Sequence, residues 1–571
     1  MSSAAFFRLG ALFLIHVSLQ AQTVKTNAVI PETQTNLPPS DTGGPLLPEQ
    51  AAYDVTHYDL ALRVDPEAQS ITGALTVHAR IVSPTGWLVL DLHTNLAVSA
   101  VTAVDHPARP RPLDFERRES RLWIAFPLTK QPGDTAQVRV AYGGKPVVAK
   151  NPPWSGGFTW SKTTNGVPWI GVSCQGEGAD LWWPCKDHPS DEPDTMALHI
   201  TVPQPLICAA NGRLQRVVRN PDGTQTFHWY ISQPINNYLV TLNIAPYRTI
   251  AGGYESVTGM TIPVTFWFLP QDYDKGRVLF TNFLKQIRFY EERLGPYPFR
   301  KDKIGVAQTP YLGMEHQTIT AYGAKFKTND YGFDWLLFHE FGHEWWGNLV
   351  TCSDWRDMWL HEGFESYMEA LYAESLQGEA AYHKYVNGFR SRRASSKPVA
   401  PRESKTGHEI YSAPIYSKGA LVLHTLRFLI GDKAFFTALR RMAYPDPRME
   451  RVSDGRQCRF ATTEDFRHIA EQSSGMNLDW FFEIYLRQPK LPRLITATNG
   501  HQLTLHWETP EHLAFPMPVE VDLGQGKHRV ELPAGTAQFS IQDTKNLRID
   551  PQRWILKEEP PAPTNAVPAR R

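Results

Sequence analysis

The segment with the most chemical potential is His339-Glu340-Phe341-Gly342-His343. Residues four apart share one face of a helix, so both imidazoles can bind one metal ion. Neutral imidazole suits Zn²⁺, at Zn–N distances of about 2.0–2.1 Å. Glu340 lies to one side of the pair, where it can take a proton from metal-bound water without binding the metal. The segment therefore indicates a hydrolytic zinc site.

A third ligand is available at Glu362, in Trp359-Leu360-His361-Glu362-Gly363-Phe364, with eighteen residues between it and His343. Two histidines and one glutamate leave the fourth position of a tetrahedral zinc ion open for water, as a catalytic site requires. We therefore predict one Zn²⁺ per chain, bound by His339, His343 and Glu362. Without the third ligand, a surface helix with solvated His and Glu side chains would remain a serious alternative.

Two helices must position these ligands. Apolar residues at helical spacing predict the first over residues 331–346, with N-cap oxygens at Asn329-Asp330 and a stop at Gly347-Asn348. The second carries Glu362, and its apolar side has the residues Leu360, Phe364, Tyr367, Met368 and Leu371.

The periodicity of apolar residues divides the rest of the chain into predicted domains. Alternating runs predict an N-terminal antiparallel β domain over 53–250, and helical spacing dominates the catalytic part over 251–487. Short alternating runs return in 488–556 and predict a small β-sandwich, followed by a disordered tail at 557–571. The fold class is therefore multidomain α+β.

The N-terminal region carries a different signal. Residues 1–21 have a basic residue, an apolar run and a small residue at a cleavage position, which is typical of a secretory signal, and 22–52 read as a flexible leader. The apolar run is shorter than the ~20 residues of a spanning helix. We expect an exported protein, periplasmic or secreted, with no stable membrane span after signal removal.

The composition limits the kinds of binding partner that are expected. The formal net charge is zero, with 58 basic and 58 acidic residues, so nothing supplies the positive field that nucleic acid requires. Five cysteines leave at least one thiol unpaired. Neither their pairing nor the oligomeric state follows from the sequence.

Four further segments accompany the zinc motif: His343-Glu344-Trp345-Trp346-Gly347-Asn348, Leu312-Gly313-Met314-Glu315-His316, Tyr416-Ser417-Lys418-Gly419, and Cys174-Gln175-Gly176-Glu177 with Trp183-Pro184-Cys185-Lys186-Asp187. In their order along the chain, these segments resemble the M1 aminopeptidase family, the gluzincin metallopeptidases that include aminopeptidase N and leukotriene A4 hydrolase. The resemblance covers roughly residues 53–556. It implies a thermolysin-like catalytic domain and a zinc aminopeptidase acting on peptides with free N-termini.

The resemblance also implies roles for individual residues. Glu315 and Gln175 would receive the free α-amino group, with Gly313 and Met314 in the same substrate-binding motif. A buried carboxylate pairs well with an ammonium and poorly with an uncharged amide, which would restrict cleavage to chain ends. Glu340 would activate the water.

Two further residues have roles by resemblance. Tyr416 matches the family tyrosine that stabilises the oxyanion. Glu369 matches a family glutamate, and is a candidate partner for one of the zinc histidines.

The sequence departs from the family pattern at four positions without losing a catalytic atom: Leu312 for Gly, His316 for Asn, His361 for Asn and Glu365 for Ala. These changes put the shape of the amine pocket in question. Many family members also continue into a long helical C-terminal domain. Because this sequence ends at Arg571, we expect a more open cleft that admits longer peptides.

Three other functions are less consistent with the sequence. A zinc endopeptidase would have no use for Glu315 as an amine anchor. Epoxide hydrolysis, as in leukotriene A4 hydrolase, is disfavoured because its acidic residue is His408 here. A non-catalytic peptide-binding protein on a peptidase fold would be expected to have lost one of the catalytic set, His339, Glu340, His343, Glu362 and Tyr416.

Overall fold

A computed structural model describes residues 41–105, 109–392, 396–541 and 546–559. The predicted secretory segment 1–21 lies outside these ranges, as do residues 22–40 of the leader and 560–571 of the tail. Residues 41–52 are packed, where the sequence suggests a free leader. Gly43 pairs with Thr406, Gln50 is buried, and Pro48–Ala51 form helix α1.

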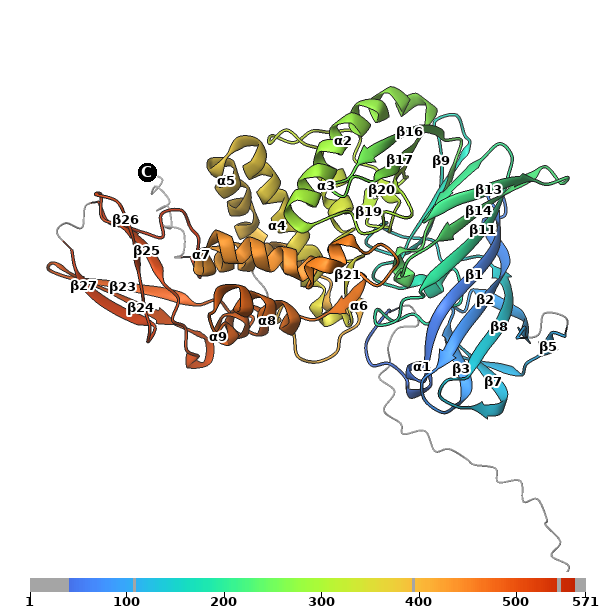
Figure 1. The fold of residues 1–571 in the computed structure, drawn as a ribbon, viewed down its shortest axis with the longest axis horizontal. Coiled ribbons are helices and arrows are strands. Elements are labelled where there is room, and N and C mark those ends of the chain that lie inside the picture. Colours follow the sequence, from blue (N-terminus) through green and yellow to red (C-terminus); the bar gives the residue numbers. More distant parts are fainter. Residues whose placement is uncertain (1–40, 106–108, 393–395, 542–545, 560–571) are drawn as a thin grey trace, which may run out of the picture. The chain divides into compact units, whose positions relative to one another are not determined.

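Three sheets make up the part from Tyr53 to Ala245, blue to green in Figure 1. The largest has the order β13-β14-β11-β1-β2-β8-β4-β5, antiparallel except for β1 and β11. Its strands are β1 (Tyr53–Asp65), β2 (Ser70–Ile81), β4 (Leu96–Ala103), β5 (Arg111–Pro112), β8 (Thr135–Gly144), β11 (Thr195–Pro203), β13 (Arg213–Arg219) and β14 (Thr224–Ile231). Buried and half-buried residues alternate along β11, which gives the sheet one apolar face.

Two smaller sheets complete this domain. One has the order β12-β15-β10-β9, with β9 (Gly157–Lys162), β10 (Pro168–Ser173), β12 (Ile207–Ala210) and β15 (Leu242–Ala245). The other has the order β3-β7-β6, with β3 (Thr85–Asp91), β6 (Phe115–Arg118) and β7 (Arg121–Lys130). The predicted β-rich N-terminal domain is confirmed, with one parallel pair in it.

The catalytic part opens on a five-stranded sheet, before its helices. The strand order is β16-β17-β18-β20-β19, with β16 (Arg248–Glu255), β17 (Thr261–Phe268), β18 (Ile304–Gln308), β19 (Gly313–Met314) and β20 (Thr320–Tyr322). Helix α2 (Tyr273–Leu294) connects the parallel strands β17 and β18. The strand β19 places Gly313 and Met314 at the sheet edge, next to the zinc helix.

Helices follow from α3 onward, green through yellow to dark orange in Figure 1. They are α3 (Trp335–Gly342), α4 (Trp359–Gln377), α5 (Glu379–Phe389), α6 (Gly407–Ile410), α7 (Ala413–Ala443), α8 (Thr463–Ser474) and α9 (Asp479–Phe482); β21 (Val350–Cys352) and β22 (Arg459–Ala461) pair in parallel. Single-turn 3₁₀ segments lie at Ala179–Leu181, Asn237–Leu239, Pro270–Asp272, Trp355–Asp357, Arg390–Arg392, Pro447–Arg451 and Pro510–His512, and a π-turn at Glu483–Arg487.

Helices α4 and α7 approach each other through two glycines. A Cβ on Gly363 would lie 2.9 Å from the Cα of Gly419, so neither position tolerates a larger residue without movement. This approach sets Glu362 on α4 beside Tyr416 on α7.

The last part of the chain has two three-stranded sheets, red in Figure 1, as the small β-sandwich prediction requires. Their orders are β23-β24-β27 and β26-β25-β28, with β23 (Arg493–Asn499), β24 (Gln502–Glu508), β25 (Val519–Asp522), β26 (Lys527–Val530), β27 (Thr536–Ser540) and β28 (Arg548–Ile549). Leu503, Leu505, Val519 and Val521 are fully buried.

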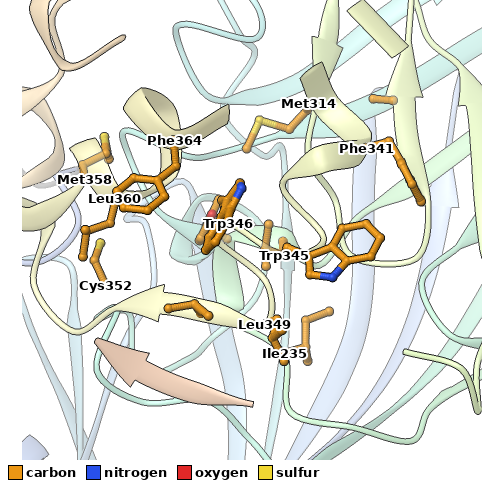
Figure 2. Close-up of a cluster of buried hydrophobic side chains, with 14 of the residues drawn as sticks. Ile235, Met314, Phe341, Trp345, Trp346, Leu349, Cys352, Met358, Leu360 and Phe364 are labelled. Atoms are coloured by element: carbon orange, nitrogen blue, oxygen red, sulfur yellow. The ribbon is translucent and has the colours of Figure 1, made fainter. Parts of the chain in front are cut away.

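A dense apolar cluster supports the zinc helix, and Figure 2 shows it at close range. Trp345 and Trp346 follow α3 and are 0% and 1% exposed, so they pack in the core and cannot form a substrate cage. Phe364 of α4 packs against Trp346, with ring centroids 4.9 Å apart and the ring planes tilted by 56°. Burial of aromatic groups of this size dominates core energetics and holds α3 and α4 together.

Two further observations bear on the sequence predictions. No helix in the described ranges is both long enough and apolar enough to cross a membrane. All five cysteines lie in those ranges and none forms a disulfide there; four are buried, and Cys458 is half-buried.

Candidate metal centre and catalytic site

The zinc helix begins later than the sequence predicts. Asp334 is the N-cap, and its Oδ1 accepts the N–H of Leu337 at 3.0 Å. Asn329 instead caps a preceding turn, accepting the N–H groups of Tyr331 and Phe333. The helix also ends early: Gly342 is its last residue and His343 follows with helical φ and ψ, so the four-residue spacing of His339 and His343 is kept.

The three predicted metal ligands come together. His339 Nε2 and His343 Nε2 are 3.4 Å apart, and Glu362 Oε2 lies 3.5 Å and 3.4 Å from them. Donors about 2.0–2.1 Å from a tetrahedral zinc ion are spaced by roughly 3.3 Å. Glu362 Oε2 is buried and has no hydrogen-bond partner among the described residues. The donor set therefore fits Zn²⁺.

Hydrogen bonds at the Nδ1 atoms orient the imidazoles of His339 and His343. His339 Nδ1 lies 2.7 Å from Glu369 Oε1, and Tyr385 donates its hydroxyl to Glu369 Oε2 at 2.6 Å. His343 Nδ1 lies 2.7 Å from the carbonyl of Trp346. Each acceptor holds a proton on Nδ1 and leaves Nε2 free to bind metal. Burial opposes ionisation of Glu362, but His343 and His339 hold its pKa below the usual range.

Glu340 lies at the edge of the same site. Burial raises its pKa to about 8, against the opposing charge of His339. A cation bound by the adjacent ligands would lower that pKa toward the range in which a general base works at neutral pH. A Cβ on Gly313 would lie 2.6 Å from Glu340 Oε1. Glycine is therefore needed at position 313, where the backbone lies against the Glu340 carboxylate.

Glu315 and Gln175 meet as the resemblance implies. Gln175 Nε2 donates to Glu315 Oε1 at 2.6 Å, and both side chains are buried. Asn348 Nδ2, five residues beyond His343, donates to the backbone carbonyl of Glu315 at 3.1 Å. Burial raises the pKa of Glu315. The site therefore offers a desolvated carboxylate whose best partner is a cation.

Tyr416 reaches the metal centre from the first turn of α7. Its hydroxyl donates to Glu362 Oε1 at 2.9 Å, and it shares a short hydrogen bond with the hydroxyl of Tyr411. Burial raises the pKa of Tyr416 well above its usual value, so it is a neutral donor at physiological pH.

A cavity of about 910 Å³ joins these groups. It is lined by all the predicted site residues: Gln175, Gly313, Met314, Glu315, His339, Glu340, His343, Glu362, Glu369 and Tyr416. Aromatic side chains form much of the remaining wall, among them Trp154, which is 55% exposed. The volume is sufficient for a short peptide segment.

Some functional neighbours were missed by sequence reasoning. Tyr385, Tyr411 and Asn348 contact site residues directly, yet no motif singles out the two tyrosines. Asn348 belongs to a segment that resembles the family and is a predicted helix stop, but the sequence assigns it no contact with the substrate site.

The substituted positions have structural consequences. His361 Nε2 accepts the N–H of Cys352 at 2.9 Å, which ties β21 to α4. Glu365 is buried below α3, against the hydroxyl of Tyr290. His316 is fully buried, and neither of its ring nitrogens has a partner among the described residues.

A β domain, a mainly helical domain and a two-histidine, one-glutamate centre define a zinc metallopeptidase. Comparison with protein families is consistent with this class. The peptidase M1 N-terminal domain matches residues 55–239, and the peptidase family M1 domain matches residues 280–485. The chain belongs to peptidase family M1, and zinc is its cofactor.

Relatives extend the comparison. Endoplasmic reticulum aminopeptidase 1 of Rattus norvegicus is 25% identical over 408 residues, which are 66% of this chain and 43% of the relative. Aminopeptidase B of Mus musculus is 26% identical over 435 residues, 69% of this chain and 63% of the relative. The chain spans about half the length of the curated relatives it matches.

Solved structures show the same fold. An M1 zinc metallopeptidase from Deinococcus radiodurans aligns with a TM-score of 0.62 at 25% identity, over 77% of this chain and 94% of the other. A mutant of the zinc metallopeptidase from the same organism, bound to a Tyr-Ser-Ala substrate, aligns with a TM-score of 0.64 at 24% identity, over 79% and 96%.

Proposed function

We propose that this chain is a zinc aminopeptidase that removes residues one at a time from the N-termini of peptides. One observation carries the proposal: the buried Glu315–Gln175 pair lines the same cavity as the metal centre. A carboxylate in this position has a use only if a cation arrives with the substrate. The free α-ammonium of a peptide is that cation.

Binding of the amine fixes the position of cleavage. The ammonium would pair with Glu315, while Gln175 holds the carboxylate through its amide N–H. An acylated terminus carries no charge and would leave Glu315 buried without a partner, which is costly. The distance from Glu315 to the metal centre then selects the first peptide bond.

Proton transfer falls to Glu340. Zinc held by His339, His343 and Glu362 supplies Lewis-acid chemistry, polarising a carbonyl and lowering the pKa of water. The Glu340 carboxylate would accept the proton of the attacking water and return it to the leaving amine. Glu340 thus has to be ionised at the start of each turnover.

Tyr416 would donate its hydroxyl hydrogen to the carbonyl oxygen as negative charge develops there. In the free enzyme that hydrogen is directed at Glu362 Oε1, so substrate would compete for it. Relatives named as aminopeptidases, and the structural relative bound to a Tyr-Ser-Ala substrate, support the proposal that this chain acts on the N-termini of peptides.

A mass-spectrometric time course on one mid-length peptide, with a free or an acetylated N-terminus, tests the proposal. We expect stepwise loss of residues from the free peptide alone. Internal cuts in both peptides would make the enzyme an endopeptidase. Cleavage of neither by protein with one zinc per chain would indicate a non-catalytic peptide-binding protein.

A further inference from the structure

The outer face of the eight-stranded sheet gathers four histidines. They come from four strands that Figure 1 shows in one sheet: His57 on β1, His78 on β2, His199 on β11 and His228 on β14. All four are half-buried, and the residues on either side of them are buried, except for the half-buried Thr56 beside His57. None of the residues that line the zinc cavity comes from these strands.

Two of the histidines form a close pair. His199 and His228 lie directly opposite each other on the antiparallel strands β11 and β14. Their Nδ1 atoms are 2.7 Å apart, and the ring centroids are 4.7 Å apart. Two neutral imidazoles can face each other in this way only if one donates a proton and the other offers its lone pair.

Asp59 decides which ring offers the lone pair. Its Oδ1 lies 3.3 Å from His199 Nε2, on the side of the ring away from His228. The carboxylate holds a proton on Nε2 and leaves the Nδ1 lone pair of His199 directed at His228. A carboxylate behind a histidine is the arrangement that orients metal-binding imidazoles in proteins.

The surroundings also suit a metal ion. Burial lowers the pKa of His228, which favours the neutral ring at physiological pH. The His199 side chain is 30% exposed, so water can reach the pair and complete the coordination. A change of tautomer in His228 would present a second lone pair without net loss of a proton.

We propose that His199 and His228 form a second metal site, which binds a divalent late transition metal ion through their Nδ1 atoms, with Asp59 orienting His199. Imidazole ligands favour Cu²⁺, Ni²⁺ and Zn²⁺ over Mg²⁺ and Ca²⁺, and Cu²⁺ binds most strongly. The described residues supply two ligands here, and water supplies the others. The two nitrogens must separate slightly to share one ion.

Copper titration of the zinc-loaded enzyme tests this site. Protein with one zinc per chain is titrated with CuCl₂, and binding is followed by equilibrium dialysis and electron paramagnetic resonance. Zinc content is measured again afterwards to exclude displacement from the catalytic centre. The variants are His199→Gln, His228→Gln and Asp59→Asn, with His78→Gln as the matched control on the same face.

We expect wild type to bind one additional Cu²⁺ with nitrogen hyperfine coupling from imidazole. His199→Gln and His228→Gln should lose this ion, Asp59→Asn should bind it about 10–100-fold more weakly, and His78→Gln should match wild type. Thermal melting of each variant verifies its fold. Absence of an additional Cu²⁺ in wild type, or unchanged binding in both His199→Gln and His228→Gln, would overturn the proposal, as would its loss in folded His78→Gln.

Discussion

The amide of Gln175 donates to the carboxylate of Glu315 at 2.6 Å, across 140 residues of sequence. Gln175 follows β10 of the N-terminal domain, and Glu315 follows β19 of the catalytic part. The proposed amine site is therefore complete only when these two regions pack together. This explains why an N-terminal β domain accompanies the zinc helices.

Removing the proton acceptor should slow turnover strongly and leave the metal centre intact. We expect Glu340→Gln to lower kcat by about 10²–10⁴-fold, the contribution typical of a positioned acid or base. Zinc content, measured by mass spectrometry, should remain at one ion per chain because Glu340 is not in the ligand set. A variant that retained wild-type kcat would show that another group accepts the proton.

Loss of the Tyr416 hydroxyl should act on the chemical step. We expect Tyr416→Phe to lower kcat by about 10²–10³-fold with little change in KM, since the donor is used mainly in the transition state. Tyr411→Phe is the comparison, because it removes the hydroxyl that is hydrogen-bonded to Tyr416 and leaves the Tyr416 hydroxyl in place. A higher KM with unchanged kcat would instead show that Tyr416 contributes to binding of the substrate in the ground state.

Substitution of Glu369 should weaken zinc binding without changing KM for the substrate. Because its Oε1 holds the Nδ1 proton of His339, we expect Glu369→Gln to weaken zinc binding by about 10–100-fold. Competition with a chelator measures this, and KM at saturating zinc should be unchanged. Glu379→Gln on α5 is the control, since the Glu379 side chain is 66% exposed. Equal zinc affinity in Glu369→Gln and wild type would remove the assigned role.

His316 should make the fold sensitive to acid. Burial lowers its pKa to about 3, from an ordinary value of 6.5. As the pH falls below 6.5, the unfolded chain binds a proton at this position and the folded chain does not. The free energy of unfolding should therefore fall by about 1.4 kcal/mol per pH unit between pH 6.5 and 3 from this residue, with no effect above pH 6.5.

Substitution isolates that contribution. We expect His316→Asn to reduce the slope of urea midpoint against pH between pH 5 and 6.5, whatever its effect at pH 8. His506→Asn, at an exposed position on β24, should leave the slope unchanged. Identical slopes in wild type and His316→Asn would mean that the buried imidazole accepts a proton in the folded state.

The sequence could predict the metal centre because its geometry is local. A four-residue spacing brings His339 and His343 together on any helix, even on one that begins at Asp334 instead of Asn329. Glu362 was accessible through its spacing and the family resemblance. The spacing alone does not determine how α3 and α4 cross, which depends on packing such as that of Trp346 against Phe364.

Contacts between segments far apart in the sequence could not be predicted from it. Nothing in the composition of α5 directs Tyr385 toward Glu369, and nothing near Tyr416 marks Tyr411 as its partner. The sheet at the start of the catalytic part was also missed, because β18, β19 and β20 are short and buried and lack an alternating pattern. Such features follow from tertiary packing and not from local propensity.

The most direct test of the central claim is the dependence of kcat/KM on the α-ammonium of the substrate. An amino-acid p-nitroanilide is compared with the analogue in which hydrogen replaces the amino group, using zinc-loaded wild type and Glu315→Gln. We predict that wild type prefers the amine by about 100-fold or more, and that Glu315→Gln loses most of this preference through slower cleavage of the amine substrate. An unchanged preference in Glu315→Gln would contradict the account.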